Sequence, residues 1–200
     1  MKNCLAIFDF DKTITDRDTL TDFIRFQAGR RKFYRGLAAN LFTLILYVLK
    51  LVPNYTAKEK VLVHFFSGMP EKDMIAAGDS YAVKRLPAII APQALERIKY
   101  HREQGHKLVI VSASPVYWYR AWAEENGFSE IISTELEISD GKLTGKLSGG
   151  NCYGPEKVQK LKNRIDTGKF DCIYAYGDSS GDRELLAMAD EAYLKYKRLR

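Results

Sequence analysis

Three short apolar runs are spaced along the chain of 200 residues, and each ends at polar residues. The runs are residues 4–8 (Cys-Leu-Ala-Ile-Phe), 108–111 (Leu-Val-Ile-Val) and 172–176 (Cys-Ile-Tyr-Ala-Tyr). Such runs predict strands buried on both faces, as in a parallel sheet. Helical patterns at 115–127 and 155–166, an extended stretch at 130–134 and a hairpin pattern at 138–147 lie between the last two runs. The alternation predicts an α/β fold with a Rossmann-like parallel sheet.

A long helical stretch interrupts this alternation after the first strand. No strand pattern is visible there, and helices are expected at residues 19–28, 31–52, 57–66 and 71–89. We therefore expect a helical cap domain of residues 18–90, inserted into an α/β core domain made of residues 1–17 and 91–200. The cap should lie over the carboxyl edge of the sheet.

Composition places the chain among ordinary globular proteins, with 46% apolar and 28% charged residues. The three cysteines are odd in number and far apart, which favours a reducing compartment over a disulfide framework: Cys4, Cys152 and Cys172. The first apolar run meets Asp9 and Asp11 too early for a secretory signal. We expect a cytoplasmic protein, or one held peripherally at the inner face of the membrane.

The net charge of +6 has two readings. It is either ordinary solubilising charge or an attraction to anions such as acidic lipid, nucleic acid or a phosphorylated molecule. A basic nucleic-acid-binding module is the non-enzyme alternative. No recognised binding motif supports it, and carboxylates at the sheet edge would repel phosphates unless a metal joined them. We therefore expect no nucleic-acid partner.

One cap segment is unusually apolar. Residues 36–49 carry no charge and are apolar on nearly every helical face. Fourteen residues are too few to span a bilayer core comfortably. Three interpretations stay open: a helix buried in the cap, a dimer contact, or a helix on an anionic membrane surface. The last gains support from the basic cluster just before it: Arg30, Arg31, Lys32 and Arg35.

Reactive side chains follow each of the three strands. Asp9 and Asp11 come after the first, Ser112 comes at the end of the second, and Asp178 and Asp182 come after the third. In open α/β sheets, ligands bind at this carboxyl edge. Two carboxylates buried together need a cation, and a divalent metal takes carboxylate oxygens. Each motif alone has a structural explanation as a turn or helix cap, so the convergence carries the argument.

The order of these motifs resembles the haloacid dehalogenase (HAD) superfamily of phosphatases. The four family motifs are met by Asp9, Asp11 and Thr13; by Ser112; by Lys157; and by Gly177, Asp178 and Asp182. The resemblance covers the whole chain, and the helical insertion lies where the family's first cap type is placed. The subgroup it resembles contains phosphoserine phosphatase and hydrolases related to phosphatidylglycerophosphate phosphatase of type C.

The resemblance implies a phosphomonoester hydrolase with a Mg²⁺ cofactor and an aspartyl-phosphate intermediate. Asp9 would be the nucleophile and Asp11 the general acid and base. Mg²⁺ would bind Asp9, the backbone carbonyl of Asp11 and Asp178, while Asp182 would hold a metal-bound water or support the lysine. The remaining implied residues contact phosphate: Ser112, Ala113 and Lys157.

The substrate stays open between two classes. Phosphoserine phosphatases carry a Glu nine residues after the nucleophile, and here that position is Asp18, which is one methylene shorter. No confident counterpart of their substrate-binding Arg is visible in the cap. The substrate is therefore either a small soluble phosphomonoester such as phosphoserine, or a lipid phosphate such as phosphatidylglycerophosphate at the membrane surface.

Overall fold

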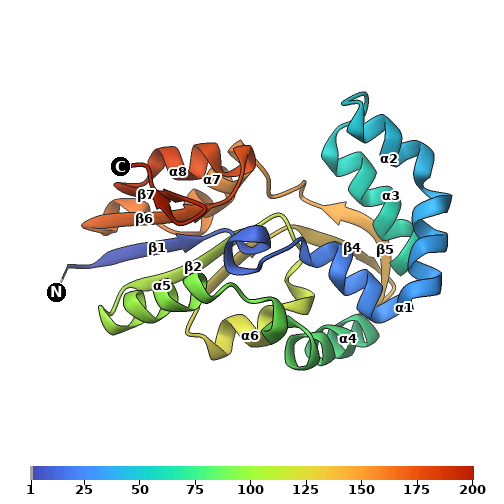
Figure 1. The fold of residues 1–200 in the computed structure, drawn as a ribbon, viewed down its shortest axis with the longest axis horizontal. Coiled ribbons are helices and arrows are strands. Elements are labelled where there is room, and N and C mark those ends of the chain that lie inside the picture. Colours follow the sequence, from blue (N-terminus) through green and yellow to red (C-terminus); the bar gives the residue numbers. More distant parts are fainter. Residues whose placement is uncertain (1) are drawn as a thin grey trace.

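The computed structural model describes residues 2–200 and has an α/β core at one end and a helical cap at the other (Figure 1). The core sheet has six strands in the order β3-β2-β1-β6-β7-β8, all parallel except β8. The strands are β1 (Cys4–Phe8), β2 (Lys107–Ser112), β3 (Glu130–Ser133), β6 (Cys172–Gly177), β7 (Glu191–Leu194) and β8 (Lys197–Arg198). The α/β class and the three apolar strands are confirmed.

Helices cover both faces of this sheet, as the apolar strands require. Alternate residues of β1 point to opposite faces, so Ala6 and Phe8 pack in one apolar cluster while Leu5 and Ile7 pack in the other. Helices lie on both sides of the sheet in Figure 1. They are α5 (Pro92–Glu103) and α6 (Arg120–Glu125) on the first face, and α7 (Pro155–Arg164) and α8 (Arg183–Met188) on the second.

The cap consists of four helices between β1 and α5. They are α1 (Thr19–Ala39), α2 (Leu41–Val48), α3 (Asn54–Phe66) and α4 (Glu71–Lys84). The predicted break before residue 31 lies at Gly29, whose φ of 75° interrupts α1. The predicted continuous helix over 31–52 is wrong, because the chain leaves the helical path at Asn40 and α2 already ends at Val48. The Gly36 carbonyl accepts from both the backbone N and the side-chain Nδ2 of Asn40, which closes the end of α1.

Two further helix predictions were too long. The stretch 71–89 ends its α-helix at Lys84 and continues as a 3₁₀ turn, Leu86–Ile89, because Pro87 disfavours the helical conformation of the residue before it. The stretch 115–127 splits into a 3₁₀ turn, Val116–Trp118, and the shorter α6. A periodic apolar pattern does not reveal such breaks.

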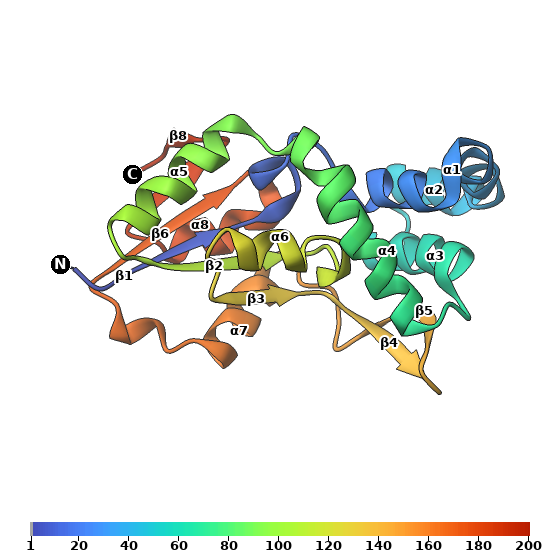
Figure 2. The same ribbon diagram turned by 90° about the horizontal axis from the view of Figure 1, so that it is seen from below.

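The predicted hairpin is present and belongs spatially with the cap. Strands β4 (Glu135–Ser139) and β5 (Lys142–Ser148) are joined at Asp140 and Gly141, which both take positive φ. The hairpin packs beside α3 (Figure 2), and the Leu143 carbonyl accepts a bond from Gly68 N at 2.8 Å. The cap therefore receives a segment from the far half of the sequence, while the domain boundaries stay a prediction.

The apolar segment 36–49 forms the end of α1 and all of α2. No residue of α2 is buried, so the interpretation of this helix as cap core is wrong. Among residues 2–200, no helix is both long enough and apolar enough to cross a bilayer.

Candidate active site

The carboxyl edge of the sheet gathers the predicted motif residues. Strand β1 pairs with both β2 and β6, so the loops after these three strands meet. Asp9 follows β1 directly, and Asp11 lies in the turn Phe10–Ile14, where Lys12 takes a positive φ. A side chain on Gly177 would put its Cβ only 2.5 Å from Asp182 Cβ, so glycine permits the loop after β6 to fold back.

Lys157 joins two of the carboxylates in the interior. Its Nζ lies 2.5 Å from Asp9 Oδ1 and 2.6 Å from Asp182 Oδ1. Its side chain is only 3% exposed, so this lysine is buried rather than solvated at the surface. Burial alone would lower the pKa of Lys157, but Asp9 and Asp182 outweigh it and raise this pKa.

The carboxylates exceed the positive charge that Lys157 brings. Burial raises the pKa of Asp9 to about 8; Lys157 opposes this shift, while Asp182 and Asp11 add to it. Burial and the neighbouring Asp182 also raise the pKa of Asp178. Carboxylate oxygens of Asp9, Asp178 and Asp182 all lie within 4.8 Å of one another. This set of hard oxygen donors fits a divalent cation such as Mg²⁺.

Among these three aspartates, Asp182 already accepts hydrogen bonds with both of its carboxylate oxygens. Its Oδ2 accepts from the backbone nitrogens of Asp178 and Ser179, at 3.1 and 3.2 Å, and its Oδ1 accepts from Lys157. It therefore fixes the loop that carries Asp178. Asp9 and Asp178 are the carboxylates placed to contact a cation directly.

Asp11 lies in a separate hydrogen-bond network. Its Oδ1 is 2.6 Å from both the backbone N and the Oγ1 of Thr19, and its Oδ2 is 2.5 Å from Ser114 Oγ. Burial and the nearby Asp18 carboxylate raise the pKa of Asp11, against the hydrogen bonds from Ser114 and Thr19. The raised pKa favours the protonated form of Asp11 more than in an ordinary Asp. Sequence reasoning missed Thr19 and Ser114, because neither stands in a motif.

The loop after β2 contributes the expected Ala113 and also Ser114 to the pocket lining, which does not include Ser112. Ser112 is fully buried, and its Oγ accepts from Ser114 N at 3.0 Å. Ala113 and Ser114 line the pocket above Asp9. Asp18 also lines this pocket, and its Oδ1 caps α1 by accepting from Thr21 N at 2.8 Å.

Lys58 is a pocket residue that sequence reasoning did not identify. It projects from α3 of the cap, donates from Nζ to the Ala113 carbonyl, and lies 3.1 Å from Asn151 Oδ1. Burial lowers the pKa of Lys58 to about 8, although Asp11 and Asp18 act in the opposite direction. No sequence signal separates it from Lys60 on the same helix. The contact ties the cap to the loop after β2.

The pocket over the carboxylates has a volume of about 420 Å³ and two kinds of wall. Its floor is polar and comes from the loops after β1, β2 and β6. Its cap side is largely apolar and comes from helices α1, α2 and α3: Leu20, Ile24, Phe33, Leu37, Leu44, Tyr47 and Val61. It can therefore take a charged group at the floor and an apolar group beneath the cap.

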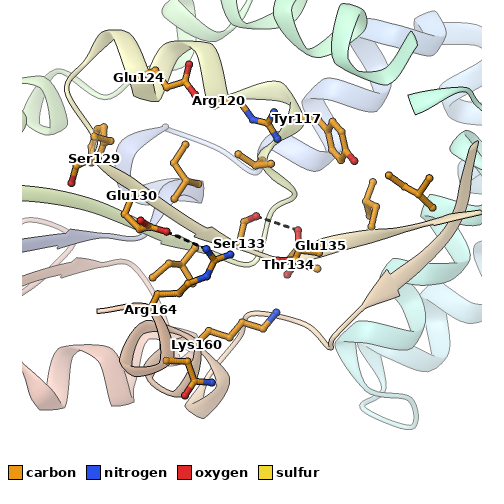
Figure 3. A pocket seen from close by; sticks show the side chains of 17 residues that line it. Tyr117, Arg120, Glu124, Ser129, Glu130, Ser133, Thr134, Glu135, Lys160 and Arg164 are labelled. Atoms are coloured by element: carbon orange, nitrogen blue, oxygen red, sulfur yellow. Dashed lines mark hydrogen bonds and ion pairs between the residues drawn. The ribbon is translucent and has the colours of Figure 1, made fainter. Parts of the chain in front are cut away.

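A larger hollow, of about 660 Å³, lies along the edge strand β3 (Figure 3). Its charged side chains include Glu130 and Arg164, which pair with each other at 3.6 Å. None of the four motifs contributes a residue to it. The chemistry therefore belongs to the smaller pocket.

A parallel α/β sheet whose first strand ends in buried carboxylates beneath a helical cap is the architecture of a phosphatase-type hydrolase. The sequence profile described as haloacid dehalogenase-like hydrolase matches residues 6–187, and the chain belongs to this family. It is 34% identical over 188 residues to protein CicA from Caulobacter vibrioides, an alignment covering 94% of this chain and 83% of CicA.

Phosphatases are among the similar proteins. The phosphoserine phosphatase SerB1 of Mycobacterium tuberculosis is 25% identical over 194 residues, covering 94% of this chain and 63% of SerB1. A substrate-bound phosphoserine phosphatase structure superposes with a TM-score of 0.70 at 20% identity, covering 97% of this chain and 86% of that one. The superposition establishes the common fold. With the family assignment, these relatives identify the chain as a phosphatase.

Proposed function

We propose that the chain is a Mg²⁺-dependent phosphomonoester hydrolase that forms an aspartyl-phosphate on Asp9. The observation that carries the proposal is the buried Asp9 carboxylate, held by Lys157 at the floor of the pocket. Mg²⁺ bound by Asp9 and Asp178 would supply positive charge against the phosphoryl oxygens. Lys157 would add a second positive charge to the same region.

In the first half of the reaction, an Asp9 oxygen attacks phosphorus and the bond to the leaving oxygen breaks. Asp11 donates its proton to that oxygen, so the product leaves as a neutral alcohol. The raised pKa of Asp11 supports this role, because the group must enter the step protonated. Thr19 and Ser114 hold the carboxyl group in place.

In the second half, a water attacks the phosphorus of the aspartyl-phosphate. Asp11, now ionised, accepts a proton from this water, and the bond from phosphorus to the Asp9 oxygen breaks. Inorganic phosphate leaves, Asp9 is restored as a carboxylate, and Asp11 is again protonated. The two carboxyl groups thus divide nucleophilic and acid–base work between them.

The decisive comparison pairs Asp9→Asn with Asp79→Asn, an exposed aspartate on α4. Phosphate release from p-nitrophenyl phosphate should require Mg²⁺ in the wild type, vanish in Asp9→Asn and persist in Asp79→Asn. Mass spectrometry of the acid-quenched wild-type protein should find the phosphoryl group on Asp9. Normal turnover by Asp9→Asn would refute the nucleophile assignment.

For the substrate, we propose a phosphomonoester with an apolar portion, such as phosphatidylglycerophosphate, over phosphoserine. The apolar cap side of the pocket supports this choice, because a bound amino acid would leave that surface poorly matched. The phosphoserine phosphatases among the relatives support the soluble alternative. Phosphate release from the two compounds, measured side by side, separates these classes. Leu44→Asn, on the apolar wall, should weaken turnover of the lipid more than turnover of phosphoserine.

A further inference from the structure

We propose that helix α2 and the basic half of α1 dock the cap onto an anionic membrane surface. This inference goes beyond phosphatase chemistry, because it concerns a surface outside the pocket. Two independent observations carry it. One is the exposure of apolar side chains on α2, and the other is the distribution of charge along the chain.

Several apolar side chains of α2 and the following turn face solvent. Phe42 and Val48 are each 75% exposed, and no residue of α2 is buried. We call the exposed apolar set the α2 patch: Leu41, Phe42, Ile45, Val48, Leu49 and Leu51. Scattered exposed apolar residues are ordinary, but a contiguous group of this kind marks an interaction surface.

The positive charge of the chain is concentrated around this patch. Residues 23–58 contain seven Lys and Arg residues and no Asp or Glu, whereas the rest of the chain has 24 basic and 25 acidic residues. Six of the seven are exposed: Arg25, Arg30, Arg31, Lys32, Arg35 and Lys50. The net positive charge of the protein therefore resides in one segment of the cap, whose exposed basic residues precede the patch or lie within it.

The combination of exposed apolar and basic side chains indicates what kind of partner binds this surface. A second copy of the chain would bring two like-charged segments together, which disfavours a symmetric dimer. A nucleic acid would meet the cations but would leave the aliphatic side chains uncovered. An anionic bilayer satisfies both, because its headgroups attract Lys and Arg while its acyl boundary accepts apolar side chains.

The docked orientation would also bring the pocket close to the lipid. Leu44 and Tyr47 of α2, and Leu37 at the end of α1, line the pocket above Asp9. Helices α1 to α3 form the end of the molecule away from both chain termini (Figures 1 and 2). The core would therefore project away from the membrane, while the pocket wall would lie next to it.

Sedimentation with vesicles tests the proposal on the whole protein. Wild type should pellet with phosphatidylcholine vesicles that contain phosphatidylserine, and should stay in solution with phosphatidylcholine alone. Val48→Glu should weaken binding about tenfold or more, because it puts a negative charge in the patch. Val83→Glu on α4 is the matched control, since Val83 is 73% exposed, and it should bind like wild type.

A second pair of variants tests how much the basic side chains contribute to vesicle binding. The triple change Arg30→Gln, Arg31→Gln and Lys32→Gln should weaken binding about tenfold or more. The triple change Lys72→Gln, Lys84→Gln and Lys162→Gln removes the same charge from exposed positions elsewhere and should leave binding within about twofold of wild type. If both triple variants lost the same amount of vesicle binding, the net charge alone would explain binding, and the proposed surface would be wrong.

Other outcomes overturn the proposal as well. They are wild-type protein that ignores anionic vesicles, Val48→Glu and Val83→Glu that bind equally, or a dimer in solution that Val48→Glu dissociates. Salt-sensitive binding to DNA that survives Val48→Glu would instead assign the cations to nucleic acid. The phosphatase proposal is judged separately: the surface variants should hydrolyse p-nitrophenyl phosphate normally, while Asp9→Asn should bind vesicles without turnover.

Discussion

Lys157 Nζ lies 2.5 Å from Asp9 Oδ1, although 148 residues separate the two in the sequence. The same nitrogen holds Asp182 at 2.6 Å, so one cation from α7 connects the loops after β1 and β6. Because all three side chains are buried, removing the lysine would leave two carboxyl groups without their ionic partner. The site is therefore also part of what holds the core together.

Lys157→Met should both destabilise the fold and stop turnover. The change leaves the Asp9 and Asp182 carboxylates buried without their lysine, and breaking such a group typically costs about 3–5 kcal/mol. Chemical denaturation in the absence of divalent metal measures this loss. Lys162→Met, an exposed position on the same helix, should retain wild-type stability. Equal stability of the two variants would contradict the structural role of the lysine.

Asp11→Asn should separate the two halves of the reaction. With p-nitrophenyl phosphate, the leaving group departs without needing a proton, so Asp9 can still be phosphorylated. Hydrolysis of the aspartyl-phosphate then lacks its base, a loss of about 10²–10⁴-fold. Rapid-mixing measurements should show a burst of p-nitrophenol followed by slow steady-state release. A steady-state phase as fast as that of the wild type would place Asp11 outside the second step.

Lys58→Met tests the contact between cap and core. Lys58 Nζ donates to the Ala113 carbonyl and to Asn151, and hydrogen bonds of charged groups contribute about 1.5–3 kcal/mol. We expect kcat/KM to fall by about tenfold or more, because the cap would hold the pocket less firmly. Lys60→Met, at an exposed position of α3, is the matched control. Steady-state kinetics of both variants measure the effect. An unchanged kcat/KM in Lys58→Met would show that this contact does not support catalysis.

The core of the fold could be predicted from the sequence, because its central strands are apolar in sequence and buried in the structure. An unbroken apolar run is typical of a strand in the middle of a parallel sheet. Every residue of β1 is buried, as this interpretation requires. The motif carboxylates followed from the same pattern, since strand ends in a parallel sheet share an edge. Asp9 and Asp178 therefore lie together as expected. Lys157 was expected beside them only from the family resemblance, and the chemical roles of all three remain proposals.

The cap contacts were not predictable in the same way. Thr19 and Lys58 reach the site only because the cap docks on the core, and no local signal describes that docking. Likewise, the apolar pattern of α2 predicted a helix but not whether anything covers it. The break at Asn40 depends on the conformation of a single residue. Long-range packing, rather than propensity, decided each of these features.

His101 should make the protein sensitive to acid from outside the active site. It is fully buried on α5, with ring nitrogens 2.7 Å from His106 Nδ1 and 2.9 Å from the Tyr176 hydroxyl oxygen. Burial lowers the pKa of His101 to about 3, and His106 and Arg97 act in the same direction. The unfolded chain should bind this proton near the usual pKa of about 6.5, well before the folded protein does.

The resulting stability is present above pH 6.5 and is lost as the pH falls from there towards 3, because only the unfolded state gains the proton. The free energy of unfolding should fall by up to about 1.4 kcal/mol per pH unit from this group. Urea denaturation at a series of pH values should therefore give a shallower slope for His101→Gln than for wild type. His64→Gln, at an exposed position on α3, should keep the wild-type slope. Parallel slopes for wild type and His101→Gln would show that other groups govern the acid transition.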